Sequence, residues 1–232
     1  MKGPRWLLVH NSECPTSRDW LSTREAEHAD AFRFPKRRAE WVLGRLAAKR
    51  ALAALLAAEE GELAELEIRS HPDGFPLPFR RGAPLPVTLS LSHRAGVALA
   101  AVRPDCGALG CDVELVERRS EAFVRDYLDA DERARVEARH ADRDWLVPLL
   151  WSAKESALKA LRLGLSLDTR DVGVRGLDDR EGDGWRPLRV AVSPAGRILP
   201  GFWCRRGRHV LTIVGAPDLA EPVAIGEVSG SA

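Results

Sequence analysis

Cysteine is scarce in this sequence, and its spacing suits neither a zinc site nor a disulfide scaffold. The 232 residues contain four cysteines, at positions 14, 106, 111 and 204, and no Cys-x-x-Cys pair. No histidine is placed to complete a zinc site with them, and four cysteines are few for a disulfide framework in a chain of this length. We therefore expect reduced thiols, in the core or at the surface.

Long apolar runs and an excess of one charge are also absent. The first apolar stretch, Trp6–Val9, is too short for the hydrophobic region of a signal peptide, and no later stretch reaches membrane-spanning length. The 35 Lys and Arg residues nearly balance the 34 Asp and Glu residues, so the formal charge is +1. A near-neutral total gives no general reason to expect binding to nucleic acid or to a membrane. These absences favour a cytoplasmic protein.

The residues that are present predict a folded chain that mixes helices and strands. Apolar residues make up 45% of the sequence and charged residues 30%, which is the balance of a globular protein. Apolar spacing and turn residues divide the chain into elements. Helices are predicted at 17–30, 37–60, 120–140 and 144–163, and strands at 6–9, 66–69, 87–91, 97–102, 109–116, 172–175, 188–192 and 202–214, the last interrupted at 205–208.

These elements follow the same order twice: a strand, two helices, then several strands. We therefore expect an α+β fold of two similar subdomains at 1–104 and 105–220, joined near Arg103–Gly107, and a flexible tail at 221–232. No repeat is visible at the level of single residues, so the duplication rests on the order of the elements. A groove between two such subdomains is a natural place for a ligand.

The segment Gly110–Glu114 places two carboxylates two residues apart. On a strand, Asp112 and Glu114 would point to the same side, while Cys111 and Val113 face the core. Paired carboxylate oxygens suit Mg²⁺, which also binds substrate phosphates and water. The alternative is an ordinary strand face that carries acidic residues to solvent.

The segment Trp151–Ala160 places an acid and a base on one side of a predicted helix. Glu155 and Lys159 are four residues apart and share a face, whereas the apolar residues form a separate stripe for packing. Taken alone, such a pair is usually a weak surface salt bridge.

Two further segments could contact phosphate. Ser92 and His93 follow a predicted strand, where their side chains could donate hydrogen bonds to an anion or could cap a turn. Arg38, Arg45 and Lys49 fall along one narrow stripe of the predicted helix, which would suit a nucleotide phosphate or could be a solvated helix face.

Read in order, these segments resemble the Sfp-type 4′-phosphopantetheinyl transferase family. The resemblance spans about residues 37 to 167, and its most specific parts are the two acidic segments at their separation. The matching text is Leu43–Leu52, Leu91-Ser92-His93, Gly110–Glu114, Trp151–Ser156 with Lys159, and the glycine-containing turn Gly164–Leu167.

The resemblance implies a fold and an activity. The fold would be two pseudo-symmetric subdomains, each a small, mostly antiparallel sheet packed with helices, usually in a monomer with coenzyme A and Mg²⁺ between the halves. The reaction would move the phosphopantetheine arm of coenzyme A onto a serine of an apo acyl or peptidyl carrier protein and release 3′,5′-ADP. Such carriers serve fatty acid, polyketide and nonribosomal peptide synthesis.

The resemblance also implies roles for individual residues. Asp112, Glu114 and Glu155 match the metal-binding acids of the family, and Lys159 matches the lysine near the transferred phosphate. The base that activates the serine would be Glu155 or a metal-bound water. The expected coenzyme A contacts are Ser92, His93, Arg38 and Arg45.

One departure from the family concerns a turn. Members often have Gly-Lys-Pro where this chain has Gly74-Phe75-Pro76. Phe75 cannot donate a charge-assisted hydrogen bond to phosphate, and an arginine such as Arg69, Arg80 or Arg81 could substitute for the lysine. Two alternative functions stay open. One is a catalytically degenerate module that binds coenzyme A or a carrier protein, and the other is a nucleic-acid-binding protein, which the near-zero net charge disfavours.

Overall fold

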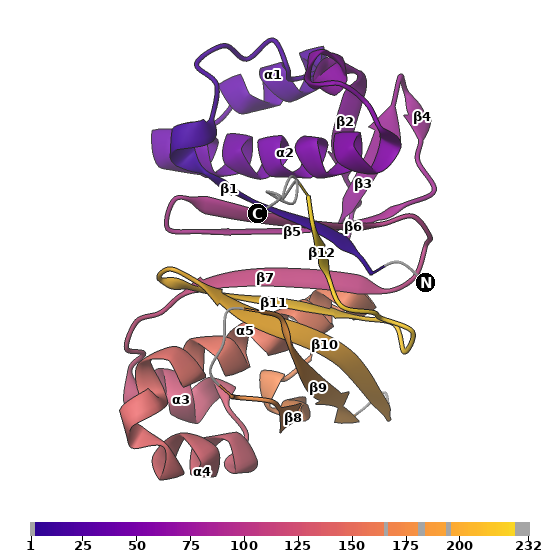
Figure 1. Ribbon diagram of the computed structural model, residues 1–232. Helices are drawn as coiled ribbons and strands as arrows, with labels where there is room; N and C mark the ends of the chain where they lie inside the picture. The colour runs from indigo at the N-terminus through magenta and orange to yellow at the C-terminus, as the bar shows by residue number, and fades with distance from the viewer. Residues whose placement is uncertain (1–2, 165–166, 181–183, 194–195, 226–232) are drawn as a thin grey trace, which may run out of the picture. The chain divides into compact units, whose positions relative to one another are not determined.

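The computed structural model describes residues 3–164, 167–180, 184–193 and 196–225. The chain divides into two compact units: Met1–Gly107 together with Pro222–Ala232, and Ala108–Glu221. Each unit contains antiparallel sheet packed against helices (Figure 1), so the prediction of an α+β fold is confirmed.

The first unit has a four-stranded sheet with strand order β12-β1-β6-β5 and a three-stranded sheet with order β2-β3-β4. Helix α2 lies against the four-stranded sheet (Figure 1), because its Leu and Ala side chains fill the core between them. The elements are β1 Arg5–His10, α1 Thr23–Asp30, α2 Pro35–Leu56, β2 Leu66–Ser70, β3 Pro76–Arg80, β4 Ala83–Pro84, β5 Thr88–Arg94, β6 Val97–Arg103 and β12 Val223–Ala224, with short 3-10 helices at Asn11–Glu13 and Glu60–Glu65.

The second unit has one five-stranded antiparallel sheet with strand order β7-β11-β10-β9-β8. Helix α5 packs on β7 and β11, and its apolar residues share a core with β8, β9 and β10. The elements are β7 Leu109–Leu115, α3 Glu121–Tyr127, α4 Ala130–Ala138, α5 Arg143–Leu161, β8 Val172–Leu177, β9 Arg186–Val192, β10 Arg197–Arg206 and β11 His209–Gly215, with short 3-10 helices at His140–Asp142 and Thr169–Asp171.

Several predicted elements differ in extent from those observed. The single helix expected at 120–140 is two helices, because Asp129 caps α4 through the backbone N–H of Glu132. The helix expected from residue 17 begins at Thr23, after a capping box formed by Ser22 and Glu25. Strands β3 and β4 were not predicted, since prolines at 76, 78 and 84 obscure the strand pattern.

The tail expected at 221–232 contains a paired strand in its described part. Val223 and Ala224 form β12 and run parallel to β1, with Arg5 opposite Val223 and Trp6 opposite Ala224. Two residues are too few to give a strand signal in the sequence. Among the described residues, no helix is long and apolar enough to cross a membrane.

Candidate active site

Strand β7 directs its two carboxylates toward helix α5. A Cβ atom added at Gly110 would collide with the backbone carbonyl of Ser156 and lie 2.6 Å from the nitrogen of Ala160, so this face of β7 touches α5. Asp112 and Glu114 follow at spacings of two and share that face. The carboxylates therefore share the face that packs against α5, whereas Cys111 and Val113, which were expected to face the core, lie on the other face and outside the core cluster under α5. Asp112 is buried, at 4% exposure, so this is not an ordinary solvent-facing strand face.

Helix α5 presents one partly exposed stripe. Within residues 151–160, Trp151, Glu155 and Lys159 are half-buried, and the other seven residues are buried. The three are spaced by four residues and therefore lie on one side of the helix. The predicted separation of a polar and an apolar face is thus present in the structure.

Lys159 joins the helix stripe to the strand. Its Nζ atom lies 2.7 Å from Oδ1 of Asp112 and donates a second bond, of 3.1 Å, to the carbonyl of Cys111. Desolvation is the largest single influence and opposes the charge on Lys159, but Asp112, Cys111 and Glu155 together outweigh it, so the pKa of Lys159 is raised. The site therefore contains an ammonium group that is fixed beside a buried carboxylate.

Glu155 lies within electrostatic range of both members of that pair. Burial raises the pKa of its carboxyl, the nearby Lys159 ammonium opposes the rise, and the like charge of Asp112 adds to it. A carboxylate in such surroundings holds a proton more readily than one in water, which is the property of a general base.

Glu114, the third predicted acid, is engaged elsewhere. Its Oε2 accepts a hydrogen bond of 2.7 Å from Nη2 of Arg119. The same guanidinium reaches Glu117 at 3.0 Å and lies over the ring of Phe123. The carboxylate is therefore fixed by an arginine of the loop that follows β7.

The predicted convergence of Asp112, Glu114 and Glu155 on one ion is not found. Among the described residues, no group of three or more His, Cys, Asp or Glu side chains is close enough to hold a metal ion. The chemistry of Asp112 and Glu155 still fits Mg²⁺, which commonly takes one or two protein carboxylates and completes its shell with substrate phosphates and water. These two carboxylates therefore fit a Mg²⁺ site whose remaining ligands come from the substrate and water.

Three buried hydroxyl groups fix α5 on the sheet beside this cluster. Oγ1 of Thr212 lies 2.8 Å from Oγ of Ser152 and 2.7 Å from Oγ of Ser156. Thr212 is the register partner of Asp112 on the neighbouring strand β11. These contacts and the glycine at 110 set the distance between the helix stripe and the strand carboxylates, and sequence reasoning assigned no role to the hydroxyl groups.

The basic stripe of α2 is largely internal. Lys49 is fully buried, forms an ion pair with Glu25, and donates a hydrogen bond of 2.8 Å to the carbonyl of Trp20. Arg45 is 8% exposed, lies 3.9 Å from Glu25 and stacks over Trp41. Both are therefore structural cations, contrary to the expectation of a solvent-facing stripe, and Arg38 is the half-buried member.

Ser92 and His93 lie within β5 and not after it. Ser92 is half-buried and His93 is exposed. A Cβ atom added at Gly44 of α2 would lie 3.9 Å from the His93 ring, so the histidine is beside this helix. The turn follows at Ala95 and Gly96, which both have positive φ.

The turn that replaces the family's Gly-Lys-Pro contains stacked rings. Phe75 stacks on His71 with 4.1 Å between ring centroids. The three arginines considered as substitutes are paired with glutamates of their own region: Arg69 with Glu67, Arg80 with Glu62, and Arg81 with Glu65. Within the described residues, the contacts of these arginines do not show that any of them takes the place of the family's lysine.

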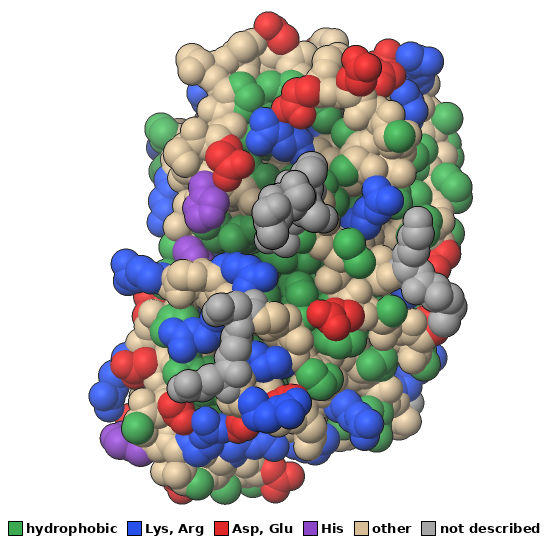
Figure 2. Space-filling view, viewed as in Figure 1, with side chains coloured by type: hydrophobic (Ala, Val, Ile, Leu, Met, Phe, Trp, Pro, Cys, Tyr) green, Lys and Arg blue, Asp and Glu red, His purple; other side chains and the backbone are tan. Residues whose placement is uncertain are grey.

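Basic side chains also gather on the surface of the second unit. Figure 2 shows Lys and Arg (blue) over the lower part of the visible face, which belongs to this unit in Figure 1. Its exposed arginines include Arg189, Arg197, Arg205 and Arg208. Such a surface attracts anionic groups, although these residues are not part of the carboxylate cluster.

One comparison with known proteins finds a match, and it lies in the second unit. Residues 108–213 match the family model of the 4′-phosphopantetheinyl transferase superfamily, a span that includes Asp112, Glu155 and Lys159. A search of curated proteins finds no match to the chain. Members of this superfamily use coenzyme A, typically with a divalent metal, and act on carrier proteins. The chain is therefore similar to the 4′-phosphopantetheinyl transferase superfamily over residues 108–213, which is a little under half of its length.

Proposed function

We propose that this chain is an Sfp-type transferase that moves the phosphopantetheine arm of coenzyme A onto a serine of an apo acyl or peptidyl carrier protein. The observation that supports this most is the Asp112–Lys159 pair beside Glu155, inside the span that matches the superfamily. The proposal extends to a monomeric, cytoplasmic enzyme that activates carriers of fatty acid, polyketide or nonribosomal peptide synthesis.

In the proposed reaction, the serine hydroxyl of the carrier attacks the β-phosphorus of coenzyme A, the one esterified to pantetheine. The new bond joins the serine oxygen to this phosphorus, and the bond to the oxygen of 3′,5′-ADP breaks. Glu155, which lies beside Lys159 and Asp112, accepts the proton of the serine hydroxyl. Lys159 stabilises the charge on the departing phosphate.

Asp112 and Glu155 would hold Mg²⁺, which would supply neutralisation of the phosphate charge. Before substrate binds, Lys159 neutralises Asp112, which limits the cost of a buried, unpaired carboxylate. Ser92, His93 and Arg38 are the proposed contacts of the first unit with coenzyme A, whereas Arg45 is committed to Trp41 and Glu25.

The test is incubation of the full chain with coenzyme A, Mg²⁺ and a panel of apo carrier proteins, followed by mass spectrometry of each carrier. We expect at least one carrier to gain the mass of one phosphopantetheine group. Binding of coenzyme A without a mass change on any carrier would contradict the proposal and favour the degenerate binding module. Salt-dependent binding to DNA, with no response to coenzyme A, would favour a nucleic-acid-binding protein.

A further inference from the structure

The two units share a repeat at the level of single residues that the sequence did not reveal. An aromatic residue, a leucine and a capping residue are followed by a glutamate at the third position of a helix. In the first unit these are Trp20, Leu21, Ser22 and Glu25, and in the second they are Tyr127, Leu128, Asp129 and Glu132. Both glutamates close a capping box with the capping residue.

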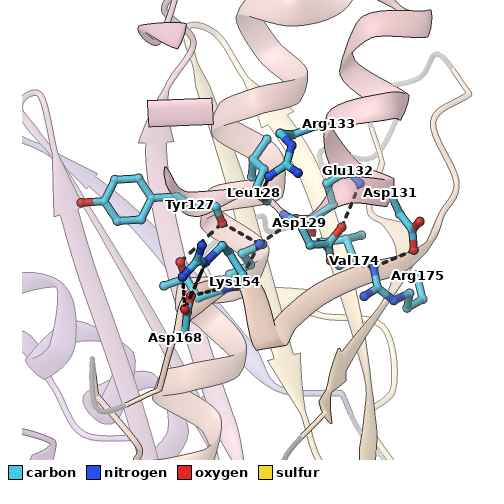
Figure 3. A network of polar contacts seen from close by, with 12 residues as sticks. Tyr127, Leu128, Asp129, Asp131, Glu132, Arg133, Lys154, Asp168, Val174 and Arg175 are labelled. Atoms are coloured by element: carbon cyan, nitrogen blue, oxygen red, sulfur yellow. Dashed lines mark hydrogen bonds and ion pairs between the residues drawn. The ribbon is translucent and has the colours of Figure 1, made fainter. Parts of the chain in front are cut away.

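In the second unit, a buried lysine of α5 completes this arrangement (Figure 3). Lys154 forms an ion pair of 2.6 Å with Glu132, and both side chains are fully buried. Its Nζ atom also donates to the carbonyls of Tyr127, at 2.7 Å, and Thr169, at 2.9 Å. The other oxygen of Glu132 accepts the backbone N–H of Val174 in β8, at 2.8 Å. One lysine therefore ties α5 to three separate segments.

In the first unit, a buried lysine of α2 makes the corresponding contacts. Lys49 pairs with Glu25 and donates to the carbonyl of Trp20 at 2.8 Å. The other oxygen of Glu25 accepts the backbone N–H of Ile68 in β2 at 2.9 Å. Strand, helix cap and buried lysine are thus connected in the same way in both units.

The neighbours of the two lysines differ. Lys154 is followed by Glu155 and, five positions on, by Lys159, the two helix residues of the candidate site. The corresponding neighbours of Lys49 are Arg50, which pairs with Glu60, and Ala54. The first unit therefore has the buried pair without the site beside it.

The second-unit pair (Lys154 and Glu132) is placed to control the rotation of α5. Residues turn by about 100° each along a helix, so Lys154 lies about 160° around α5 from both Ser152 and Ser156. Those two serines contact Thr212 of the sheet. The helix is consequently held from nearly opposite sides, and Glu155 and Lys159 project between the two attachments.

We propose that Lys154, through Glu132, is a positioning residue that fixes the rotation of α5 and so aims Glu155 and Lys159 at Asp112; the inference rests on the proposed function. Side-chain tips lie about 5–6 Å from a helix axis, so a rotation of about 10° moves them by about 1 Å. Misplacement of catalytic groups by about 1 Å can slow a reaction about 100-fold.

The pair is a poor candidate for stability alone. Both side chains are fully buried, so the loss of their hydration opposes both charges. A buried ion pair of this kind can often be replaced by uncharged residues of similar volume without loss of stability. Its geometric role is therefore separable from its contribution to folding.

The test compares Lys154→Met/Glu132→Gln with the matched first-unit variant Lys49→Met/Glu25→Gln in the full chain. Both double variants keep side-chain volume and remove the two charges of the lysine–glutamate pair together; in the first unit, Arg45 also loses Glu25 but keeps its stacking on Trp41. We expect the second-unit variant to lose kcat for phosphopantetheine transfer by about tenfold or more, with KM for coenzyme A within about threefold of wild type. The first-unit variant should keep kcat within about threefold at a comparable melting temperature.

A more conservative exchange covers the case in which the double variant does not fold. Glu132→Asp keeps the charge but withdraws the carboxylate by one methylene, and Glu25→Asp is its control; kcat should fall only for the former. Equal kcat in the wild type and a folded Lys154 or Glu132 variant, or equal losses from the two units, would overturn the positioning role alone. A wild-type chain that transfers nothing would instead overturn the proposed function itself.

Discussion

At the scale of single residues, the site depends on how two neighbouring carboxylates of β7 are partnered. Asp112 is paired with Lys159 of the helix stripe, whereas Glu114 is paired with Arg119 of the following loop. The first pair belongs to the cluster with Glu155. The two acids are therefore expected to differ in function although they share a strand face.

We predict that Asp112→Asn lowers kcat/KM for transfer at least about 100-fold, because it removes a charge at the reacting phosphates while keeping the side-chain shape. Glu114→Gln, the matched control, should cost less than about tenfold. Steady-state kinetics with one carrier protein, and circular dichroism to establish folding, measure both effects. Equal losses for the two variants would indicate a site that needs three acidic ligands.

Lys159 offers a second test at this scale. Lys159→Met removes the cation that faces Asp112 and would leave a buried carboxylate without its ion-pair partner. We predict a loss of kcat of about 100-fold, with a lower melting temperature than that of wild type. Arg162→Met, at the end of the same helix, is the control. A Lys159 variant as active as this control would remove the lysine from the mechanism.

At the scale of secondary-structure elements, the distance between β7 and α5 is set by Gly110. The absence of a side chain allows the backbone of Ser156 to lie against the strand, where an added Cβ atom would overlap the carbonyl oxygen. This need for glycine is independent of backbone dihedral angles, because Gly110 does not have a positive φ. The close approach brings the helix stripe to the strand carboxylates.

We predict that Gly110→Ala destabilises the protein by about 3 kcal/mol or more, since the clash is with backbone that cannot rotate away. The melting temperature should fall by about 6 °C or more. Gly61→Ala is a suitable control, because nothing lies within 4 Å of an added Cβ atom there. A calorimetric scan in which both variants melt like wild type would show that the close approach is not required.

Much of the secondary structure could be predicted from the sequence. The long helices were predicted because their apolar spacing is regular, and the shared face of Asp112 and Glu114 followed from strand alternation. The roles of Arg45 and Lys49 could not be predicted, because their partner Glu25 lies on another helix. The sequence pattern of a basic stripe on a helix is the same whether the stripe faces water or a buried carboxylate.

At the scale of the whole molecule, the two units contain the same framework of contacts with different residues beside it. Each has a capped helix, a buried lysine–glutamate pair and a strand that the glutamate contacts. The order of elements predicted the duplication, but the residue-level repeat emerged only in three dimensions. The spacing between its residues differs in the two units: Lys49 follows Glu25 by 24 positions, whereas Lys154 follows Glu132 by 22.

The central claim is that the chain transfers an intact phosphopantetheine group to one serine. The most direct measurement quantifies 3′,5′-ADP and the mass of the carrier protein in the same reaction, using an apo carrier and its Ser→Ala variant. We predict equal molar amounts of 3′,5′-ADP and modified carrier with the apo carrier, and neither product with its Ser→Ala variant. Release of 3′,5′-ADP without a mass increase on the carrier, or no release at all, would contradict it.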